Sequence, residues 1–139
     1  MTHRNGGSGD LSMAGEDYLE AIYRIALEDG SEHGVRSVDV AEQLGVSKAS
    51  VSKALAGLRD SGYVEQVRYG RVRLTEEGRA YAKEVWHRHR LLRTFLTVEL
   101  GVDADVADDE ACLMEHAISN ETMQLWMGYL ERHGVAVEG

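Results

Sequence analysis

The hydrophobic and polar positions of this chain follow the period of an α-helix over most of its length. In the stretch "MAGEDYLEAIYRIALEDG", apolar side chains recur every three or four positions. Ser12 can cap the start of a helix there, and Gly30 can end it. The pattern therefore predicts a first helix between these residues, with an inward face made of Tyr18, Leu19, Ile22, Ile25 and Ala26.

Two shorter helical patterns follow, joined by a glycine. "SVDVAEQLG" predicts a helix that Ser37 could cap and Gly45 ends. "VSKASVSKALAGLRDSG" predicts a second helix, with Ser47 as its cap and Gly62 as its terminator. Two short helices around a glycine-centred turn are typical of a helix-turn-helix unit.

The segment "YVEQVRYGRVRLT" has apolar residues on both sides of a Tyr-Gly pair, which predicts a two-stranded hairpin. A hairpin directly after a helix-turn-helix is a wing. Thr75 can then cap a long helix that Gly101 ends, and two further helices are predicted, broken near Ser119. The chain contains no proline and many strong helix formers, so the fold class should be mainly α.

This pattern divides the chain into three parts. We predict a disordered tail over residues 1–11 and a winged helix-turn-helix DNA-binding domain over residues 12–75. A helical dimerisation and metal-binding domain should occupy residues 76–139. The C-terminal helices carry more apolar bulk than a small domain can cover, so part of it should form a subunit interface and part a core: Trp86, Phe95, Leu113, Leu125, Trp126, Met127 and Leu130.

The hydropathy and cysteine content of the chain indicate the compartment in which the protein is found. No apolar run reaches 18 residues, and the polar start "MTHRNGGSGD" lacks the apolar middle of a signal peptide. A single cysteine cannot form an intrachain disulfide, which fits a reducing compartment. We expect a soluble, cytoplasmic protein that does not contact a membrane.

The net charge of −9 is unevenly distributed along the chain. Residues 1–35 have a net charge of −5 and residues 101–139 one of −8, whereas residues 36–73 carry seven basic and four acidic residues, a net charge of +3. One basic segment in an acidic protein indicates a localised face for a polyanion.

The polar residues of the second short helix gather at its N-terminal end, which a recognition helix presents to bases and phosphates in the major groove. Each of them could equally be a solvated surface position, but the helix-turn-helix, the wing and the charge agree with one another. The candidate DNA-contacting residues are Ser37, Ser47, Lys48, Ala49, Ser50, Ser52 and Lys53 on the helices and Arg68 and Arg71 on the wing.

A second group of residues suggests a metal site. Cys112, Glu115 and His116 are spaced i, i+3 and i+4, so on a helix they share one face with Cβ atoms about 5–6 Å apart. Thiolate, carboxylate and imidazole all bind divalent first-row metals. Taken alone, a Glu-His pair is often solvent-facing and a lone cysteine is often a small buried hydrophobe.

Further ligands are available on two other helices, where Asp17 and Glu20 are spaced i, i+3 and "HRHR" offers His87 or His89. Cys112 could also be a nucleophile with His116 as its base. However, no glycine-rich oxyanion loop or orienting third group accompanies that pair. We therefore expect no enzyme activity.

Four stretches together resemble the DtxR/MntR family of metal-dependent transcriptional repressors: "GEDYLEAIY", "VAEQLGVSKASVSKALAGLRDSGYV", "RHRLLRTFL" and "DEACLMEHAIS". The resemblance covers roughly residues 12–133. It implies a homodimer that binds palindromic double-stranded operator DNA once a metal is bound. It also implies metal ligands at Asp17, Glu20, His89, Cys112, Glu115 and His116.

The implied ligand set combines two branches of that family. Asp17 and Glu20 match the manganese branch, as does the short chain, whereas Cys112 matches the iron branch. Arg93 and Asp108 stand where the iron branch has an acidic ligand and a histidine of an ancillary site, so that site should be altered here. Hard carboxylate oxygens favour Mn(II) and a thiolate favours Fe(II), Co(II) or Zn(II).

We therefore expect a Mn(II)-dependent repressor of manganese homeostasis or uptake genes, with Fe(II) as the alternative effector and Zn(II) or Co(II) able to occupy the site in vitro. A different class remains open, a metal-independent winged-helix regulator whose C-terminal helices only dimerise or bind a protein. In that case Cys112, Glu115 and His116 would be incidental.

Overall fold

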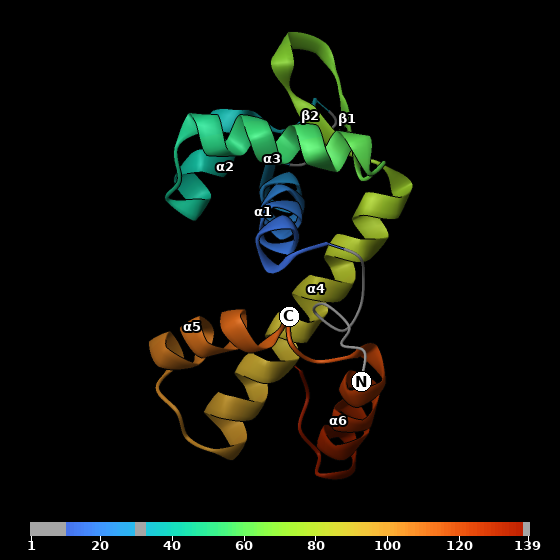
Figure 1. Ribbon diagram of the computed structural model, residues 1–139. Coiled ribbons are helices and arrows are strands. Elements are labelled where there is room, and N and C mark those ends of the chain that lie inside the picture. The colour runs from blue at the N-terminus through green and yellow to red at the C-terminus, as the bar shows by residue number, and fades with distance from the viewer. Residues whose placement is uncertain (1–10, 30–32, 138–139) are drawn as a thin grey trace. The chain divides into compact units, whose positions relative to one another are not determined.

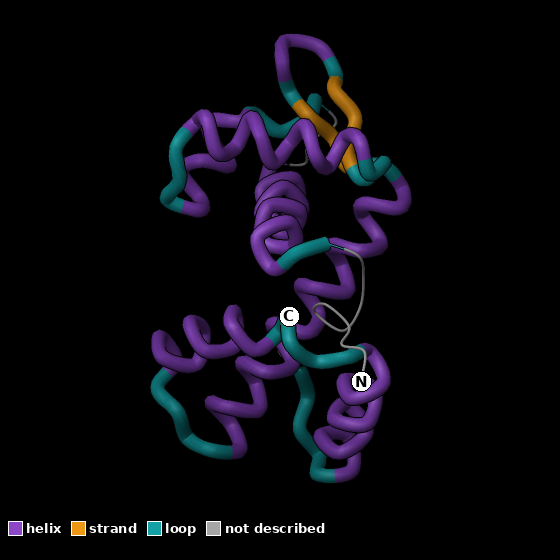
Figure 2. Tube along the Cα trace, viewed as in Figure 1, coloured by secondary structure: helices purple, strands orange, loops and turns teal. Residues whose placement is uncertain are grey.

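The computed structural model describes residues 11–29 and 33–137. The tail predicted over residues 1–11 falls almost wholly outside this part of the chain. The described residues form two compact units, one covering residues 14–83 and one beginning at Glu84. Helices dominate both units, which confirms the mainly α class (Figures 1 and 2).

The first unit begins with three helices: α1 (Met13–Asp29), α2 (Ser37–Leu44) and α3 (Lys48–Asp60). The helix α2 packs on α3, and between them Gly45 adopts φ +66° and donates its N–H to the Ala41 carbonyl. This is the predicted helix-turn-helix. The apolar faces of α1, α2 and α3 are buried at Leu19, Ile22, Val40, Val51, Leu55 and Leu58.

The two predicted caps of these helices had different outcomes. Ser47 caps α3, because its Oγ accepts a hydrogen bond from the Ser50 N–H at 3.1 Å. The prediction that Ser37 caps α2 is wrong. Arg36 occupies the N-cap position, and its side chain makes no hydrogen bond to a backbone N–H of the first turn. Its guanidinium instead makes two hydrogen bonds to the Asp39 carboxylate.

The wing is an antiparallel hairpin of β1 (Val64–Gln66) and β2 (Val72–Leu74), with Val64 opposite Leu74 (Figure 2). Val35 adds one bridge to Val72. The turn contains the predicted Tyr69-Gly70 pair, and both residues adopt positive φ, +63° and +71°. A tyrosine in this left-handed region is uncommon, and Tyr69 is 92% exposed at the tip of the wing.

Helix α4 (Glu76–Thr94) starts in the first unit and continues into the second. Thr75 caps it as predicted, accepting a hydrogen bond from the Gly78 N–H at 3.0 Å. Gly78 lies so close to the Tyr63 backbone that a Cβ added there would overlap the Tyr63 carbonyl oxygen. The start of α4 is thereby fixed against the end of the helix-turn-helix.

The second unit contains the rest of α4, a π-helical turn (Phe95–Glu99), α5 (Ala104–Met114) and α6 (Asn120–Arg132) (Figure 1). Ser119 caps α6 near the predicted break, accepting from the Thr122 N–H at 3.1 Å. Two predicted boundaries differ: regular α-helix in α4 stops at Thr94, and α5 stops at Met114, before the Glu-His pair. The core of the unit consists of Leu91, Leu92, Leu96, Ala107, Ala111, Met123 and Leu130.

The apolar residues expected to be shared between core and interface are divided in the structure. Leu130 is buried, and Phe95, Trp126 and Met127 pack against the core. Leu125 and Leu113 remain 71% and 64% exposed. Among the described residues, no helix is long and apolar enough to cross a membrane.

Candidate metal centre

Glu115 lies between two imidazoles in the second unit. Its Oε1 is 2.7 Å from His89 Nδ1, and its Oε2 is 3.5 Å from His116 Nε2. Glu115 is fully buried, and His89 and His116 are each 4% exposed. A buried carboxylate is costly unless it has partners, so the histidines and Glu115 stabilise one another in this position.

Cys112 lies near the end of α5, three residues before Glu115, which follows the helix as its C-cap. Its Sγ is within 4.8 Å of a Glu115 carboxylate oxygen, although the cysteine itself is exposed. The structure thus brings Cys112, Glu115, His116 and His89 together in one unit. Imidazole, carboxylate and thiolate in such proximity are a donor set that fits a divalent first-row metal.

Arg88 holds the chain segment that carries Glu115 and His116. It is 1% exposed, its Nε donates to the Glu115 carbonyl oxygen at 2.7 Å, and its Nη1 donates to Asn120 Oδ1 at 3.3 Å. These bonds tie α4 to the end of α5 and the start of α6. Sequence reasoning missed this residue, because only the fold shows that an arginine of "HRHR" points inward.

The two histidines of "HRHR" have different surroundings. The second ring nitrogen of His89, Nε2, is 2.7 Å from Asp108 Oδ1, and Arg93 Nε is 3.5 Å from the same oxygen. Trp86 stacks on the His89 ring at 5.3 Å. His87 is half-buried and outside this network, and desolvation together with the charge of Arg90 lowers the pKa of its imidazole.

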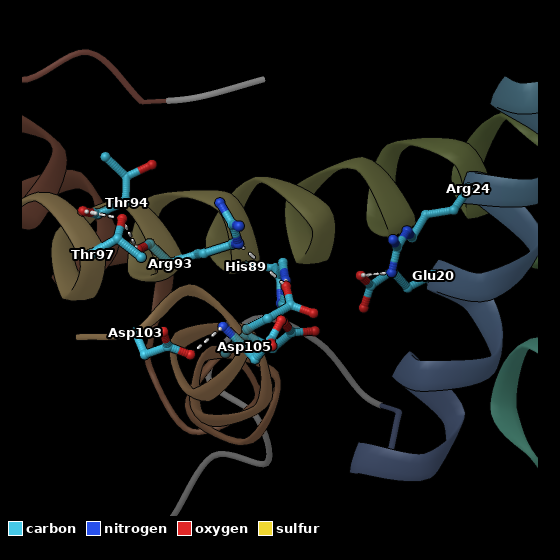
Figure 3. A network of polar contacts seen from close by, with 10 residues as sticks. Glu20, Arg24, His89, Arg93, Thr94, Thr97, Asp103 and Asp105 are labelled. Atoms are coloured by element: carbon cyan, nitrogen blue, oxygen red, sulfur yellow. Dashed lines mark hydrogen bonds and ion pairs between the residues drawn. The ribbon is translucent and has the colours of Figure 1, made fainter.

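Asp17 and Glu20 belong to the first unit and lie one turn apart on α1. Arg24 Nη1 is 4.0 Å from Glu20 Oε2 (Figure 3). Glu16, which the sequence analysis passed over, is fully buried and accepts a hydrogen bond from the Tyr81 hydroxyl at 2.6 Å. Of the three acidic residues in the first half of α1, Glu16 therefore has a structural partner, and Asp17 and Glu20 are candidate ligands.

The candidate DNA-contacting residues lie on the exposed part of the first unit. The N-terminal positions of α3 are exposed, and Ser47 donates to Ser50 Oγ at 3.0 Å. On the wing Arg68 is exposed, whereas the Arg71 guanidinium donates to the Gly34 carbonyl at 3.3 Å. The exposed candidate positions at the start of α3 are Ser47, Lys48, Ala49, Ser50, Ser52 and Lys53. Ser37, on α2, is only partly exposed.

Comparison with known families matches both units. The family described as the N-terminal DNA binding domain of iron dependent repressors matches residues 10–72. The family described as the metal binding and dimerisation domain of iron dependent repressors matches residues 75–133. These two matches cover nearly all of the described chain.

Individual proteins similar to this chain belong to the same class of regulator. The transcriptional regulator MntR of Salmonella typhimurium is 37% identical over 123 residues, which is 88% of this chain and 76% of that protein. The diphtheria toxin repressor of Corynebacterium diphtheriae is 34% identical over 112 residues, 81% of this chain and 48% of that protein. These relatives are transcriptional regulators and not enzymes, in agreement with the sequence analysis.

Solved structures give the same fold. A manganese-dependent transcriptional repressor in complex with manganese matches with a TM-score of 0.74 and 37% identity, over 84% of this chain and 52% of that one. The manganese regulator SloR matches with a TM-score of 0.74 and 28% identity, over 84% and 53%. This chain spans about half the length of these solved chains.

Proposed function

Because this chain belongs to the iron-dependent repressor family of transcriptional regulators, we propose that it represses manganese homeostasis or uptake genes. It does so as a homodimer on palindromic operator DNA when Mn(II) is bound, in the cytoplasm where such a regulator meets its operator. Residues 12–75 read the DNA, and residues 76–139 bind the metal and dimerise. The ligands are Asp17, Glu20, His89, Cys112, Glu115 and His116.

One observation carries the proposal, the buried position of Glu115 between His89 and His116. A carboxylate oxygen at 2.7 Å from one imidazole and another at 3.5 Å from a second leave several donor atoms gathered in one buried place. A protein excludes water from such a cluster at a cost in folding free energy. That cost is understandable when the cluster is built to hold a cation.

The first unit supplies the remaining ligands in this proposal. Asp17 and Glu20 stand on α1 of the DNA-binding unit, whereas His89 and Glu115 stand in the second unit. When bound, the metal would supply positive charge that offsets the negative charge of the carboxylates that hold it. By linkage, any free energy of metal binding that favours the DNA-competent arrangement returns as operator affinity.

The choice of Mn(II) rests on the two carboxylates of α1 and on the manganese-dependent relatives. Fe(II) is the alternative, supported by the thiol of Cys112 near Glu115 and by the diphtheria toxin repressor among the relatives. Zn(II) or Co(II) can occupy the same donors in vitro, because imidazole and thiolate bind them well.

The test has two stages. Selection from a random duplex library in the presence of Mn(II) first identifies an operator. Operator affinity is then measured with and without Mn(II), Fe(II) or Zn(II), anaerobically and under reducing conditions. We expect the activating metal to raise the affinity of the wild type about 5–150-fold. Glu115→Ala should abolish this gain, and Glu110→Ala, which removes an exposed carboxylate from α5, should retain it.

Equal operator affinity with and without metal would contradict the proposal. Calorimetric titration of the protein with Mn(II) then decides between the remaining interpretations. A winged-helix regulator that works without metal takes up none in a stoichiometric manner.

A further inference from the structure

His89 is held by a carboxylate on each side of its ring. Nδ1 is 2.7 Å from Oε1 of the fully buried Glu115, and Nε2 is 2.7 Å from Oδ1 of Asp108, whose side chain is 57% exposed. Only Nδ1 faces the donor cluster of the candidate metal centre. Nε2 points the other way, toward the N-terminal half of α5.

Asp108 has a second partner from α4. Arg93 follows His89 by one turn on α4 (Figure 3). Its Nε is 3.5 Å from the same Asp108 Oδ1, and its side chain is 34% exposed. His89 and Arg93, at i and i+4 on α4, therefore both contact the Asp108 carboxylate of α5. The cation already beside Asp108 neutralises its charge, which leaves it poorly suited to bind a metal ion itself.

On the basis of the proposed function, the geometry points to Asp108 as a positioning residue that orients His89 for metal binding. An imidazole that donates one N–H to a carboxylate is fixed in its tautomer and ring orientation, and its other nitrogen keeps a lone pair for a metal. Here Asp108 accepts the N–H of Nε2, so Nδ1 is the nitrogen directed at the metal. Arg93 keeps Asp108 in place for this task.

The role of Asp108 is tested by the affinity for Mn(II), measured by competition with a chromophoric chelator. The variants are Asp108→Ala, Asp108→Asn and the matched control Asp109→Ala, which removes the adjacent exposed carboxylate from α5. Asp108→Ala should bind Mn(II) about 10–100-fold more weakly than the wild type. Asp108→Asn should stay within about threefold of wild type, since its amide oxygen still accepts the N–H of His89.

The conservative variant separates the possible roles. If Asp108 were itself a metal ligand, Asn and Ala would weaken Mn(II) binding alike, and this result would overturn the inference. Equal affinity of Asp108→Ala and Asp109→Ala would also overturn it. A wild type that binds no Mn(II) would instead refute the proposed function, and the inference with it.

The variant Arg93→Gln tests the role of Asp108 independently. The pair of Arg93 and Asp108 is partly exposed, so we expect a loss of only about two- to fivefold in Mn(II) affinity, with an unchanged number of metal ions per chain. An additional Mn(II) bound by Arg93→Gln would overturn the inference, because it would show Asp108 to be a ligand that Arg93 blocks.

Discussion

The candidate DNA-contacting residues of α3 and the candidate ligands His89 and Glu115 of the second unit lie in opposite environments. At the N-terminus of α3, Lys48, Ser52 and Lys53 are exposed to solvent. In the second unit, His89 and Glu115 are almost wholly buried and bonded to each other. A DNA duplex is a large polyanion that exposed side chains can reach, whereas a metal ion requires ligands that are gathered and shielded from water beforehand.

This difference has a consequence for substitutions. A change at an exposed candidate DNA-contacting position of the first unit should alter DNA binding and leave folding nearly intact, because exposed side chains contribute little to stability. A change in the candidate metal centre should affect folding and metal binding together, because its polar groups are buried and packed against one another.

Gly78→Ala should have the largest effect on stability. It tests the packing of the first unit without changing a candidate DNA-contacting residue. The new Cβ would overlap the Tyr63 carbonyl oxygen, and backbone cannot move aside as a side chain can. We expect a loss of more than about 3 kcal/mol in the free energy of unfolding, measured by urea denaturation with circular dichroism. Gly57→Ala is the control, since a Cβ there meets no atom within 4 Å, and it should stabilise α3 by up to about 1 kcal/mol.

Arg88→Met tests whether the polar network of the second unit contributes to folding. The variant keeps most of the side-chain volume but leaves the Glu115 carbonyl and the Asn120 amide oxygen without the donors of Arg88. Urea denaturation of the metal-free protein should show a loss of about 2–3 kcal/mol. The exposed Arg132→Met should change stability by less than about 0.5 kcal/mol, and a similar small change at Arg88 would contradict the contrast between the units.

The double variant Lys48→Ala, Lys53→Ala examines the exposed face. Each lysine that contacts a phosphate adds about one unit to the slope of log affinity against log salt concentration. The double variant should therefore lose about two units of slope and bind operator DNA about tenfold more weakly at moderate salt, with unchanged stability and Mn(II) affinity. Lys83→Ala, an exposed lysine on α4, is the control, and a salt slope equal to wild type in the double variant would exclude these phosphate contacts.

Ser47→Ala should have the smallest effect, because a helix cap on an exposed face contributes little. Loss of the hydrogen bond from the Ser50 N–H should lower the free energy of unfolding by about 1 kcal/mol. Ser37→Ala, measured in the same way, should cost less than about 0.5 kcal/mol, since α2 has no side-chain cap there. Equal losses in both variants would restore the capping role that the sequence pattern assigned to Ser37.

The first unit could be predicted from the sequence in some detail because its features are local. Gly45 and Ser47 mark turn and cap through their own backbone and side-chain chemistry, and the Tyr69-Gly70 pair marks the wing turn. The error at Ser37 is of the same local kind. A serine one position inside the helix has the same pattern as a cap, and only the observed bonds from Arg36 to Asp39 distinguish the two.

The network in the second unit could be predicted only in part. The spacing of Glu115 and His116 indicated shared chemistry, and the resemblance added His89. The bonds from Arg88 to the Glu115 carbonyl and from His89 to Asp108 join residues 27 and 19 positions apart, so they depend on how α4 and α5 pack. The resemblance treated Asp108 as a lost ligand, whereas the structure gives it a partner within the protein.

Both tryptophans of the chain, Trp86 and Trp126, lie in the second unit, and their positions give that unit an optical signal of its own. The Trp86 indole stacks on the His89 ring, with centroids 5.3 Å apart and planes only 10° from parallel. Indole fluorescence is sensitive to the charge of a ring in such contact, so metal binding at the proposed ligand His89 should change the emission of Trp86. Trp86→Phe, with Trp126 retained, should remove that response. Trp86 would then serve as an intrinsic fluorescent probe of metal occupancy.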